Sequence, residues 1–489
     1  MVASTGSEGL DAVLRGGLPR HRIYLLQGDP GVGKTTLGMQ FLRTGIAAGE
    51  RCMYIALSET RDEIENVMSS HGWTMDGIDV LELSALEQSA GIANDTSLFE
   101  TNDADLHETT RVILDHIKRV KPDRLVFDSL SELRLLAQSA LRYRRQILAL
   151  KQFFAERKTT VLLLDDRTSE PTDQQLQSLA HGVLTLEQTS PLYGDDRRRL
   201  KISKLRGVRF ASGYHDFVIA TGGIRVFPRL VAAQHGTRFD ATAISSGITE
   251  LDALLGGGLD HGTSTLLLGP AGSGKSSVAI QYALAAARRQ ENVGVFLFDE
   301  RISTLYARTN ALGLDLQANV ESGRIMLQQI DPAEMSPGEF AHCVRDEVEK
   351  RQCRVIVIDS LNGYEHSIGD ERLLAIQLHE LFTYLANQGV ATIIVAAQHG
   401  LIGAMKAPID VSYLADAIVL LRYFEAAGRI RKAISVIKKR SGPHENTIRE
   451  LTLDKRGLGI GAPLVDFDGV LTGTPQFTGS ARELSRRGE

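Results

Sequence analysis

Cysteine is scarce in this chain of 489 residues, and its scarcity excludes two kinds of structural support. The three cysteines, Cys52, Cys343 and Cys353, are too few and too scattered for a disulfide framework or a four-ligand zinc site. We therefore expect them to be reduced thiols buried in the core.

Long apolar runs are also absent, and so is a strong excess of charge of either sign. No stretch approaches the roughly 18 consecutive apolar residues of a membrane-spanning helix. Residues 1–20 carry Glu8, Asp11 and Arg15 and lack the apolar centre of a signal peptide. The net charge of −5 provides no general attraction to nucleic acids or membranes. We predict a cytoplasmic protein that binds neither.

An internal repeat divides the chain. Residues 3–36 align with residues 244–277 without a gap, and 15 of these 34 positions are identical. The identities extend well beyond GDPGVGKTT (28–36) and GPAGSGKSS (269–277), which indicates that a whole domain is duplicated. Two domains of roughly 200–250 residues also suit a chain that is too long for one ordinary core.

Later segments set the limits of the two copies. Residues 123–133 match residues 353–364 at a spacing of 231 instead of 241, so the first copy holds about ten extra residues. The polar stretch 93–105 is the expected position of these residues, as a surface loop. The sequence predicts a first domain at 1–236, a second domain at 237–477 and a short polar tail at 478–489.

Short apolar runs alternate with longer amphipathic segments. RIYLLQG (22–28) and TVLLLDD (160–166) are typical runs, and residues 105–123 form a typical amphipathic segment. This alternation predicts two α/β domains, each with a mainly parallel central sheet flanked by helices.

Each copy contains G-x-x-x-x-G-K-[ST] between a predicted strand and a predicted helix, the pattern of a phosphate-binding loop. The glycines let backbone N–H groups turn toward phosphates. Lys34 and Lys275 should reach the β- and γ-phosphates, and the hydroxyls of Thr35 and Ser276 should bind Mg²⁺. ATP and Mg²⁺ are the expected cofactors. The candidate nucleotide-binding residues are Gly28, Gly31, Gly33, Lys34, Thr35, Thr36, Gly269, Gly272, Gly274, Lys275, Ser276 and Ser277.

Asp128 and Asp359 each end an apolar strand. A Walker B carboxylate at such a position holds the metal ion, usually through water. An aspartate that only ends a strand is the alternative interpretation.

A second acidic position distinguishes the copies. ALSET (56–60) carries Glu59 after Ser58, whereas LFDER (297–301) carries the adjacent carboxylates Asp299 and Glu300. A carboxylate here could orient an attacking water or take the proton of a hydroxyl nucleophile. A solvated strand end fits the pattern equally well.

Basic pairs occur late in each copy, Lys204 with Arg206 and Lys438 with Arg440. Residues two apart on a strand point to the same face, so each pair could hold one phosphate group. A solvated basic face is the simpler interpretation of the spacing.

These motifs together resemble the KaiC family of double-domain RecA-like ATPases over nearly the whole chain. The residues that carry the resemblance are STGSEGLDAVLRGGLPR and SSGITELDALLGGGLDHG before the two loops, FDSLSEL and IDSLNGY, and KLRG and KKRSG. The resemblance implies two RecA-like P-loop domains and a double ring of six subunits, with ATP bound between neighbours. It implies that the basic pairs reach the neighbour's nucleotide and that Glu59, Asp299 and Glu300 are catalytic.

Three departures from the family pattern are present. The family's second domain phosphorylates itself on an adjacent Ser–Thr pair, and the matching position here is Ser412 followed by Tyr413. Ser412 is therefore the candidate phosphoacceptor, without a two-site cycle. Ser58 replaces a carboxylate in the first domain, where we expect slow hydrolysis or ATP that only holds the ring together. The short tail speaks against a KaiA-type partner, while a KaiB-like partner on the first-domain ring is compatible with the sequence.

The sequence thus predicts a hexameric ATPase with serine autokinase activity in its second domain, acting in signalling or timing through protein partners. A RecA-like nucleic-acid motor or recombinase is one alternative. The net charge, the single tryptophan (Trp73) and the lack of a basic loop near residues 396–410 count against it. A nucleotide-gated scaffold with negligible turnover is the other alternative.

Overall fold

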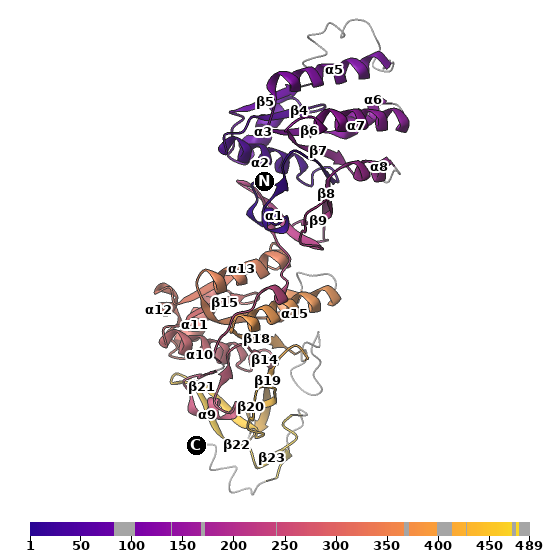
Figure 1. The fold of residues 1–489 in the computed structure, drawn as a ribbon. Coiled ribbons are helices and arrows are strands. Elements are labelled where there is room, and N and C mark those ends of the chain that lie inside the picture. The colour runs from indigo at the N-terminus through magenta and orange to yellow at the C-terminus, as the bar shows by residue number, and fades with distance from the viewer. Residues whose placement is uncertain are drawn as a thin grey trace. The chain divides into compact units, whose positions relative to one another are not determined.

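The computed structural model describes residues 1–82, 103–137, 139–167, 172–240, 242–365, 371–398, 413–426, 428–471 and 476–478. The chain forms two compact units, Met1–Arg229 and Leu230–Glu489. Each unit contains a nine-stranded sheet with helices on both faces (Figure 1). The prediction of two α/β domains with mainly parallel sheets is confirmed.

The first unit contains the following elements in chain order. They are β1 (Val2–Ala3), α1 (Glu8–Val13), β2 (Leu18–Pro19), β3 (Ile23–Gly28), α2 (Lys34–Ala47), β4 (Cys52–Ala56), α3 (Arg61–Ser70), β5 (Ile78–Glu82), α5 (Asp103–Val120), β6 (Arg124–Asp128), α6 (Leu130–Ala137), α7 (Ala140–Ala155), β7 (Thr160–Asp166), α8 (Thr172–Leu179), β8 (Gly182–Thr189), β9 (Arg197–Leu205), β10 (Tyr214–Ala220) and β11 (Gly223–Phe227).

The second unit repeats this order. Its elements are η1 (Ala232–Gln234), β12 (Ala243–Ile244), α9 (Thr249–Leu254), β13 (Leu259–Asp260), β14 (Ser264–Gly269), α10 (Lys275–Arg288), β15 (Asn292–Leu297), α11 (Ile302–Ala311), α12 (Leu316–Glu321), β16 (Ile325–Gln329), α13 (Pro337–Glu349), β17 (Cys353–Asp359), α14 (Leu361–Glu365), α15 (Glu371–Asn387), β18 (Ala391–Ala397), β19 (Ala417–Ala426), β20 (Arg429–Lys439), β21 (Arg449–Asp454), β22 (Gly457–Pro463), β23 (Phe467–Asp468) and β24 (Gln476–Phe477).

The two nine-stranded sheets have the same topology. The first has the order β11-β10-β9-β8-β3-β7-β6-β4-β5, and the second β16-β15-β17-β18-β14-β19-β20-β21-β22. In the first unit the neighbouring strands β5, β4, β6, β7, β3 and β8 pair in parallel. The strands β8, β9, β10 and β11 pair antiparallel. In both sheets the strand that precedes the phosphate loop is central, so the loop emerges at the carboxyl edge of a buried parallel strand.

Strand β3 shows why the sheet is buried on both faces. All six of its residues are buried. Tyr24 and Leu26 pack with α2 and α3, whereas Ile23 and Leu25 pack with α5 to α8. Side chains alternate between faces along a strand, so a run that is buried at every position requires helices on both sides.

Two expectations about particular segments can be compared with the fold. Cys52 and Cys353 are buried thiols, as expected, whereas Cys343 is partly exposed; all three are free. The expected surface loop at 93–105 lies outside the described residues as far as residue 102, and α5 begins at Asp103. Within the described ranges, every helix is too short or too polar to cross a bilayer.

The second unit begins ahead of the limit expected from the sequence. The backbone N–H of Ala232 donates to the Glu380 carboxylate at 2.9 Å, and the Asn387 amide donates to the Ala232 carbonyl at 3.0 Å. Both partners belong to α15, so η1 is anchored on the second unit.

Arg124 connects three parts of the first unit beneath its surface. Its guanidinium is 2% exposed, and it donates to the Glu50 carboxylate and to the carbonyls of Ser4 (2.6 Å) and Phe41 (2.8 Å). The N-terminal segment, α2 and β6 are thereby tied to one buried charge.

Replacing Arg124 by alanine should lower the free energy of unfolding of the first unit by about 3–5 kcal/mol, because the Ser4 and Phe41 carbonyls would lose their donor and Glu50 would keep only its more exposed partner, Arg20. The matched control is Arg51→Ala, which breaks the exposed Arg51–Asp123 pair (3.3 Å) and should cost less than about 1 kcal/mol. Trp73, the single tryptophan, reports unfolding of this unit by fluorescence in urea. Equal losses in the two variants would contradict the assignment.

Candidate nucleotide sites

The two phosphate loops have the backbone geometry that their glycines allow. Gly31 and Gly33 have φ of 80° and 106°, and Gly272 and Gly274 have φ of 75° and 109°. This left-handed region favours glycine. α2 begins at Lys34 and α10 at Lys275, so the N–H groups of each first turn face the loop. Such helix ends attract anions.

The loop lysines are buried and folded onto their own loops. Lys34 Nζ donates to the carbonyls of Gly28 and Asp29 at 2.9 Å and pairs with the Asp166 carboxylate at 2.7 Å. Lys275 Nζ donates to the carbonyls of Gly269 and Pro270 at 2.8 Å. Burial lowers the pKa of Lys275 to about 8, with the Asp359 charge opposing this change. A buried ammonium at a helix N-terminus suits an anionic ligand.

A hydroxyl contacts a carboxylate at the same place in both units. Thr35 Oγ1 donates to Asp128 Oδ2 at 2.9 Å, and the Tyr54 hydroxyl donates to the same oxygen at 2.6 Å. Ser276 donates to Asp359 in the second unit, and burial raises the pKa of both aspartates. Hydroxyl and carboxylate oxygens are the ligands that Mg²⁺ prefers, so the residues present fit a metal ion bound with the phosphates.

Glu59 is held near the first of these pairs. It lies in the short connection between β4 and α3, and α3 begins after it with a capping box between Thr60 and Glu63. Its Oε2 is buried and has no hydrogen-bond partner in the described part of the chain. Burial raises the pKa of Glu59 to about 7, and the nearby Asp128 charge adds to the effect. A carboxylate with such a pKa is suited to accept a proton from water near neutral pH.

The second unit holds its carboxylates differently. Asp299 accepts a hydrogen bond from the Ser360 hydroxyl. Arg308 of α11 donates to both oxygens of Glu300, at 2.6 and 3.2 Å, and also to Ser277 Oγ at 2.9 Å. Glu300 is therefore ion-paired in cis, in contrast to Glu59. The repeat aligns Arg308 with Val67 at the 241-residue spacing, so the first unit cannot form this pair.

The basic pairs lie at the opposite edge of each sheet from the loop of their own unit. Lys204 pairs with Val183 at the beginning of β8, whereas Gly28 pairs with Leu186 farther along the same strand. Lys204 Nζ donates to the Gln177 carbonyl (2.6 Å), and Arg206 donates to the Ser178 carbonyl (2.9 Å). These contacts are made before β8 begins.

The second unit repeats this arrangement. Lys438 Nζ donates to the Ala415 carbonyl at 2.8 Å and Arg440 donates to the Tyr413 carbonyl at 3.0 Å, both just before β19. Ser412, the candidate phosphoacceptor, lies immediately before these residues and outside the described part of the chain.

Three contacts were not anticipated from the sequence. Asp166 binds Lys34, Tyr54 binds Asp128, and Arg308 binds Glu300. Asp166 ends the LLLDD run of β7, and β7 lies next to the loop strand β3. The sequence shows this carboxylate at a strand end, but only the order of the strands shows that it contacts Lys34. Tyr54 and Arg308 carry no motif.

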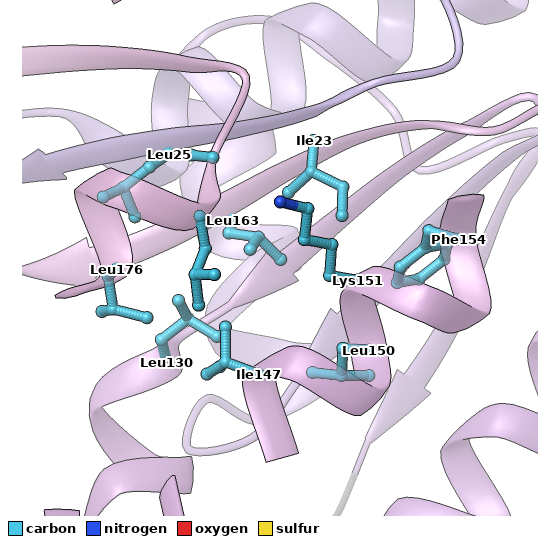
Figure 2. Close-up of a pocket in the computed structure, with 11 residues that line it drawn as sticks. Ile23, Leu25, Leu130, Ile147, Leu150, Lys151, Phe154, Leu163 and Leu176 are labelled. Atoms are coloured by element: carbon cyan, nitrogen blue, oxygen red, sulfur yellow. The ribbon is translucent and has the colours of Figure 1, made fainter. Parts of the chain in front are cut away.

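A small apolar cavity lies away from the loops, on the face of the first sheet that α5 to α8 cover (Figure 2). It is lined by Ile23, Leu25, Leu130, Ile147, Leu150, Lys151, Phe154, Leu163, Leu176, Leu179 and Ala180. Its volume of about 20 Å³ admits about one water molecule. Lys151 is the only charged residue in this lining, so the cavity is a gap in core packing and not a nucleotide site.

Comparison with known proteins agrees with this geometry. The family model "ATPase: KaiC" matches residues 3–231 and 244–464. A circadian clock protein, KaiC3 of Synechocystis sp. (strain ATCC 27184 / PCC 6803 / Kazusa), is 25% identical over 482 residues, covering 97% of this chain and 94% of that protein. The circadian clock oscillator protein KaiC of Parathermosynechococcus lividus is 27% identical over 490 residues, covering 96% of this chain and 87% of its own length.

Glu59→Gln should stabilise the nucleotide-free first unit at pH 8 and have less effect at pH 4. The unfolded chain releases the Glu59 proton near pH 4.3, whereas the folded protein retains it until about pH 7. Stability therefore falls as pH rises between these values, and glutamine removes that loss. The readout is the melting temperature, followed by Trp73 fluorescence.

Glu63→Gln is the matched control, because hydrogen bonds from Thr60 lower the pKa of Glu63. Its ionised form is favoured in the folded state, so this variant should show no gain at pH 8. A pH-independent effect of Glu59→Gln would contradict the buried, unpartnered carboxylate.

Proposed function

The chain belongs to the KaiC family of ATPases, and on that premise we propose that both of its units bind Mg·ATP and that it hydrolyses ATP as a ring. The observation that carries the proposal is the matched arrangement in both units, in which a hydroxyl–carboxylate pair adjoins a glycine-rich loop with a buried lysine. Thr35 with Asp128 and Ser276 with Asp359 form these pairs.

The roles of the residues follow from their positions. Lys34 and Lys275 exchange their loop carbonyl partners for phosphate oxygens, and the N–H groups of the loops hold the remaining phosphate charge. Thr35 with Asp128, and Ser276 with Asp359, would hold Mg²⁺, which when bound neutralises charge that develops on the phosphates.

Glu59 acts as the base in the first unit. It accepts a proton from the attacking water while the water oxygen bonds to the terminal phosphorus and the bond to ADP breaks. Its unpartnered Oε2 is free to do so without first losing an ion pair. In the second unit Glu300 must leave Arg308 to play this part, so we propose that hydrolysis in the first unit is the less hindered. Asp299, bonded to Ser360, supports the position of the Glu300 segment.

We assign the basic pairs to the nucleotide of a neighbouring subunit. Lys204 and Arg206 contact carbonyl oxygens at the sheet edge remote from their own loop. A cation at that edge can reach a nucleotide phosphate only if the nucleotide is bound by another subunit. A hexamer with nucleotides between subunits meets this requirement, as the family resemblance implies, and Lys438 and Arg440 take the same role in the second ring.

The second unit is assigned a serine autokinase activity, with Ser412 as phosphoacceptor. The support is the position of Ser412 beside Tyr413, whose carbonyl binds Arg440, a residue assigned to the neighbour's phosphates. The names of the relatives indicate clock proteins, and on that basis we propose a role in signalling or timing with a KaiB-like partner on the first ring.

Incubation with Mg·ATP should release phosphate steadily and add about one phosphate to the intact mass. Ser412→Ala should abolish the mass gain and retain phosphate release, because the acceptor hydroxyl is lost and the ATPase groups remain. Ser435→Ala, a change on β20, is the matched serine control and should keep the mass gain. Bound nucleotide without phosphate release would favour the scaffold interpretation, and release without mass gain would remove the autokinase assignment.

Mixed rings test whether Arg206 acts on a neighbour. In a Glu300→Gln background, rings made only of Glu59→Gln subunits or only of Arg206→Ala subunits should be nearly inactive. Random mixing should restore about a quarter of the sites in a head-to-tail ring, since one subunit supplies Glu59 and its neighbour Arg206. Arg209→Ala, at an exposed position, is the control and should be active alone. Absence of any recovery in rings shown to be mixed would place Arg206 in its own subunit's site.

A further inference from the structure

A buried guanidinium in the second unit has no charge partner among the residues that the structure describes. Arg422 lies on β19 with 9% of its surface exposed, and its Nε and Nη1 have no hydrogen-bond partner within the described ranges. Burial lowers its pKa, and no carboxylate of the described residues contributes to the change. Arginine stays protonated in proteins, so this position holds a positive charge that no described residue compensates.

Gln398 lies close to Arg422 at the carboxyl edge of the sheet. Leu268 of β14 pairs with Ala396 of β18 on one side and with Leu420 of β19 on the other. Gln398 and Arg422 are each two residues farther along, so their side chains share one face of the sheet on the two strands that flank β14. Gln398 Oε1 is also buried without a hydrogen-bond partner among the described residues.

Both residues adjoin the phosphate loop. The N–H of Gln398 donates to the Gly269 carbonyl at 3.1 Å. The Leu421 carbonyl would lie 2.3 Å from a Cβ placed on Gly269, and the Tyr423 hydroxyl donates to the Ala271 carbonyl at 3.1 Å. The residues on either side of Arg422 are therefore in contact with the beginning of the loop, Leu421 through its backbone and Tyr423 through its side chain.

In the first unit, the residues equivalent to Gln398 and Arg422 form an ion pair. Gly182 pairs with Tyr24 in the first unit, and Ala417 pairs with Thr265 at the equivalent place in the second. Glu187 and Arg422 each lie five residues after these positions, so they are equivalent. Arg167 matches Gln398, since its N–H donates to the Gly28 carbonyl at 3.1 Å. Arg167 and Glu187 pair at 3.2 Å. The first unit thus balances its charges at this edge, whereas the described part of the second unit leaves a cation unpaired.

We propose that Arg422, with Gln398 beside it, binds a phosphate group at the end of the second unit's phosphate loop. The two N–H groups of Arg422 suit two phosphate oxygens, and the Gln398 amide can donate to a third. The phosphate is the terminal group of a bound nucleoside triphosphate or the free phosphate that remains after hydrolysis. The site rests on the proposed nucleotide binding of the second unit and makes that unit distinguish triphosphate from diphosphate, which Arg167 and Glu187 do not do in the first.

The first test compares nucleotide binding to the full-length native protein and to the Arg422→Met variant. Equilibrium dialysis with labelled ATP or ADP counts both sites, and Trp73 fluorescence follows the first site separately, because the Trp73 ring lies against His71 (4.9 Å), which contacts Thr36 (3.3 Å). The variant should bind ATP at the second site on the order of tenfold more weakly or worse, since it loses hydrogen bonds from a charged group. ADP affinity there should change by less than about twofold, because the diphosphate lacks the group that Arg422 binds.

The second test measures the melting temperature without nucleotide. Arg422→Met should melt at the same temperature as the native protein or higher, because it removes an uncompensated buried charge. The matched control is Arg431→Met on β20, where Arg431 pairs with Glu450 at 3.4 Å; that variant should melt lower and keep the native preference for ATP over ADP.

Inorganic phosphate added to the ADP complex separates the two sources of the group. A rise in the native melting temperature that Arg422→Met lacks would identify free phosphate as a ligand, whereas no rise, with the ATP effect intact, would assign the site to the triphosphate. Equal loss of ATP and ADP affinity, no loss of either, or a lower melting temperature of the nucleotide-free Arg422→Met variant would overturn the proposal. A native second site that binds neither nucleotide would instead refute the proposed function on which it rests.

Discussion

A buried lysine at the first turn of a helix is the constraint on which both units depend. The N-terminal end of the helix is already positive, and Lys34 or Lys275 adds a full charge beside it. Loop carbonyls satisfy the ammonium hydrogens in each unit, but carbonyls carry only partial charge. The carboxylates at the neighbouring strand ends, Asp128, Asp166 and Asp359, and the phosphates of a ligand are groups that can balance this charge.

The duplicated fold lets the two copies balance charge in different ways. In the first unit Asp166 pairs with Lys34, and the base candidate Glu59 is left with an open oxygen. In the second unit Lys275 bonds only loop carbonyls among the described contacts, and Arg308 takes up Glu300. One scaffold therefore presents one site with a free carboxylate and another with a restrained one. The number of carboxylates alone suggests the reverse order of activity, since the second copy has two adjacent acids and the first has one.

Motifs that act through the backbone were predictable from the sequence. A glycine-rich loop requires particular φ values and a following helix. Both depend only on residues close together in the sequence, such as Gly31, Gly33 and Lys34. The repeat and the apolar runs likewise predicted two mainly parallel sheets with helices on both faces. The ion pair of Glu300 and the unpaired charge of Arg422 were not predictable, because Arg308 lies on a helix with no motif and the surroundings of Arg422 depend on which strands flank β14.

Composition, periodicity and short motifs are local properties, and they were sufficient to predict the duplicated α/β architecture, the glycine-rich loops and the acidic residues that end the strands beside them. Whether a given charge is paired, open or turned away is a property of strand order and helix packing. Lys204 and Arg206 illustrate the difference: their spacing was compatible with a phosphate clamp and more simply with a solvated basic face, and only the antiparallel register of β9 on β8 shows that they lie away from their own loop. Charges interact over a few ångströms in space and not along the chain, so the fold had to be known before their roles could be assigned.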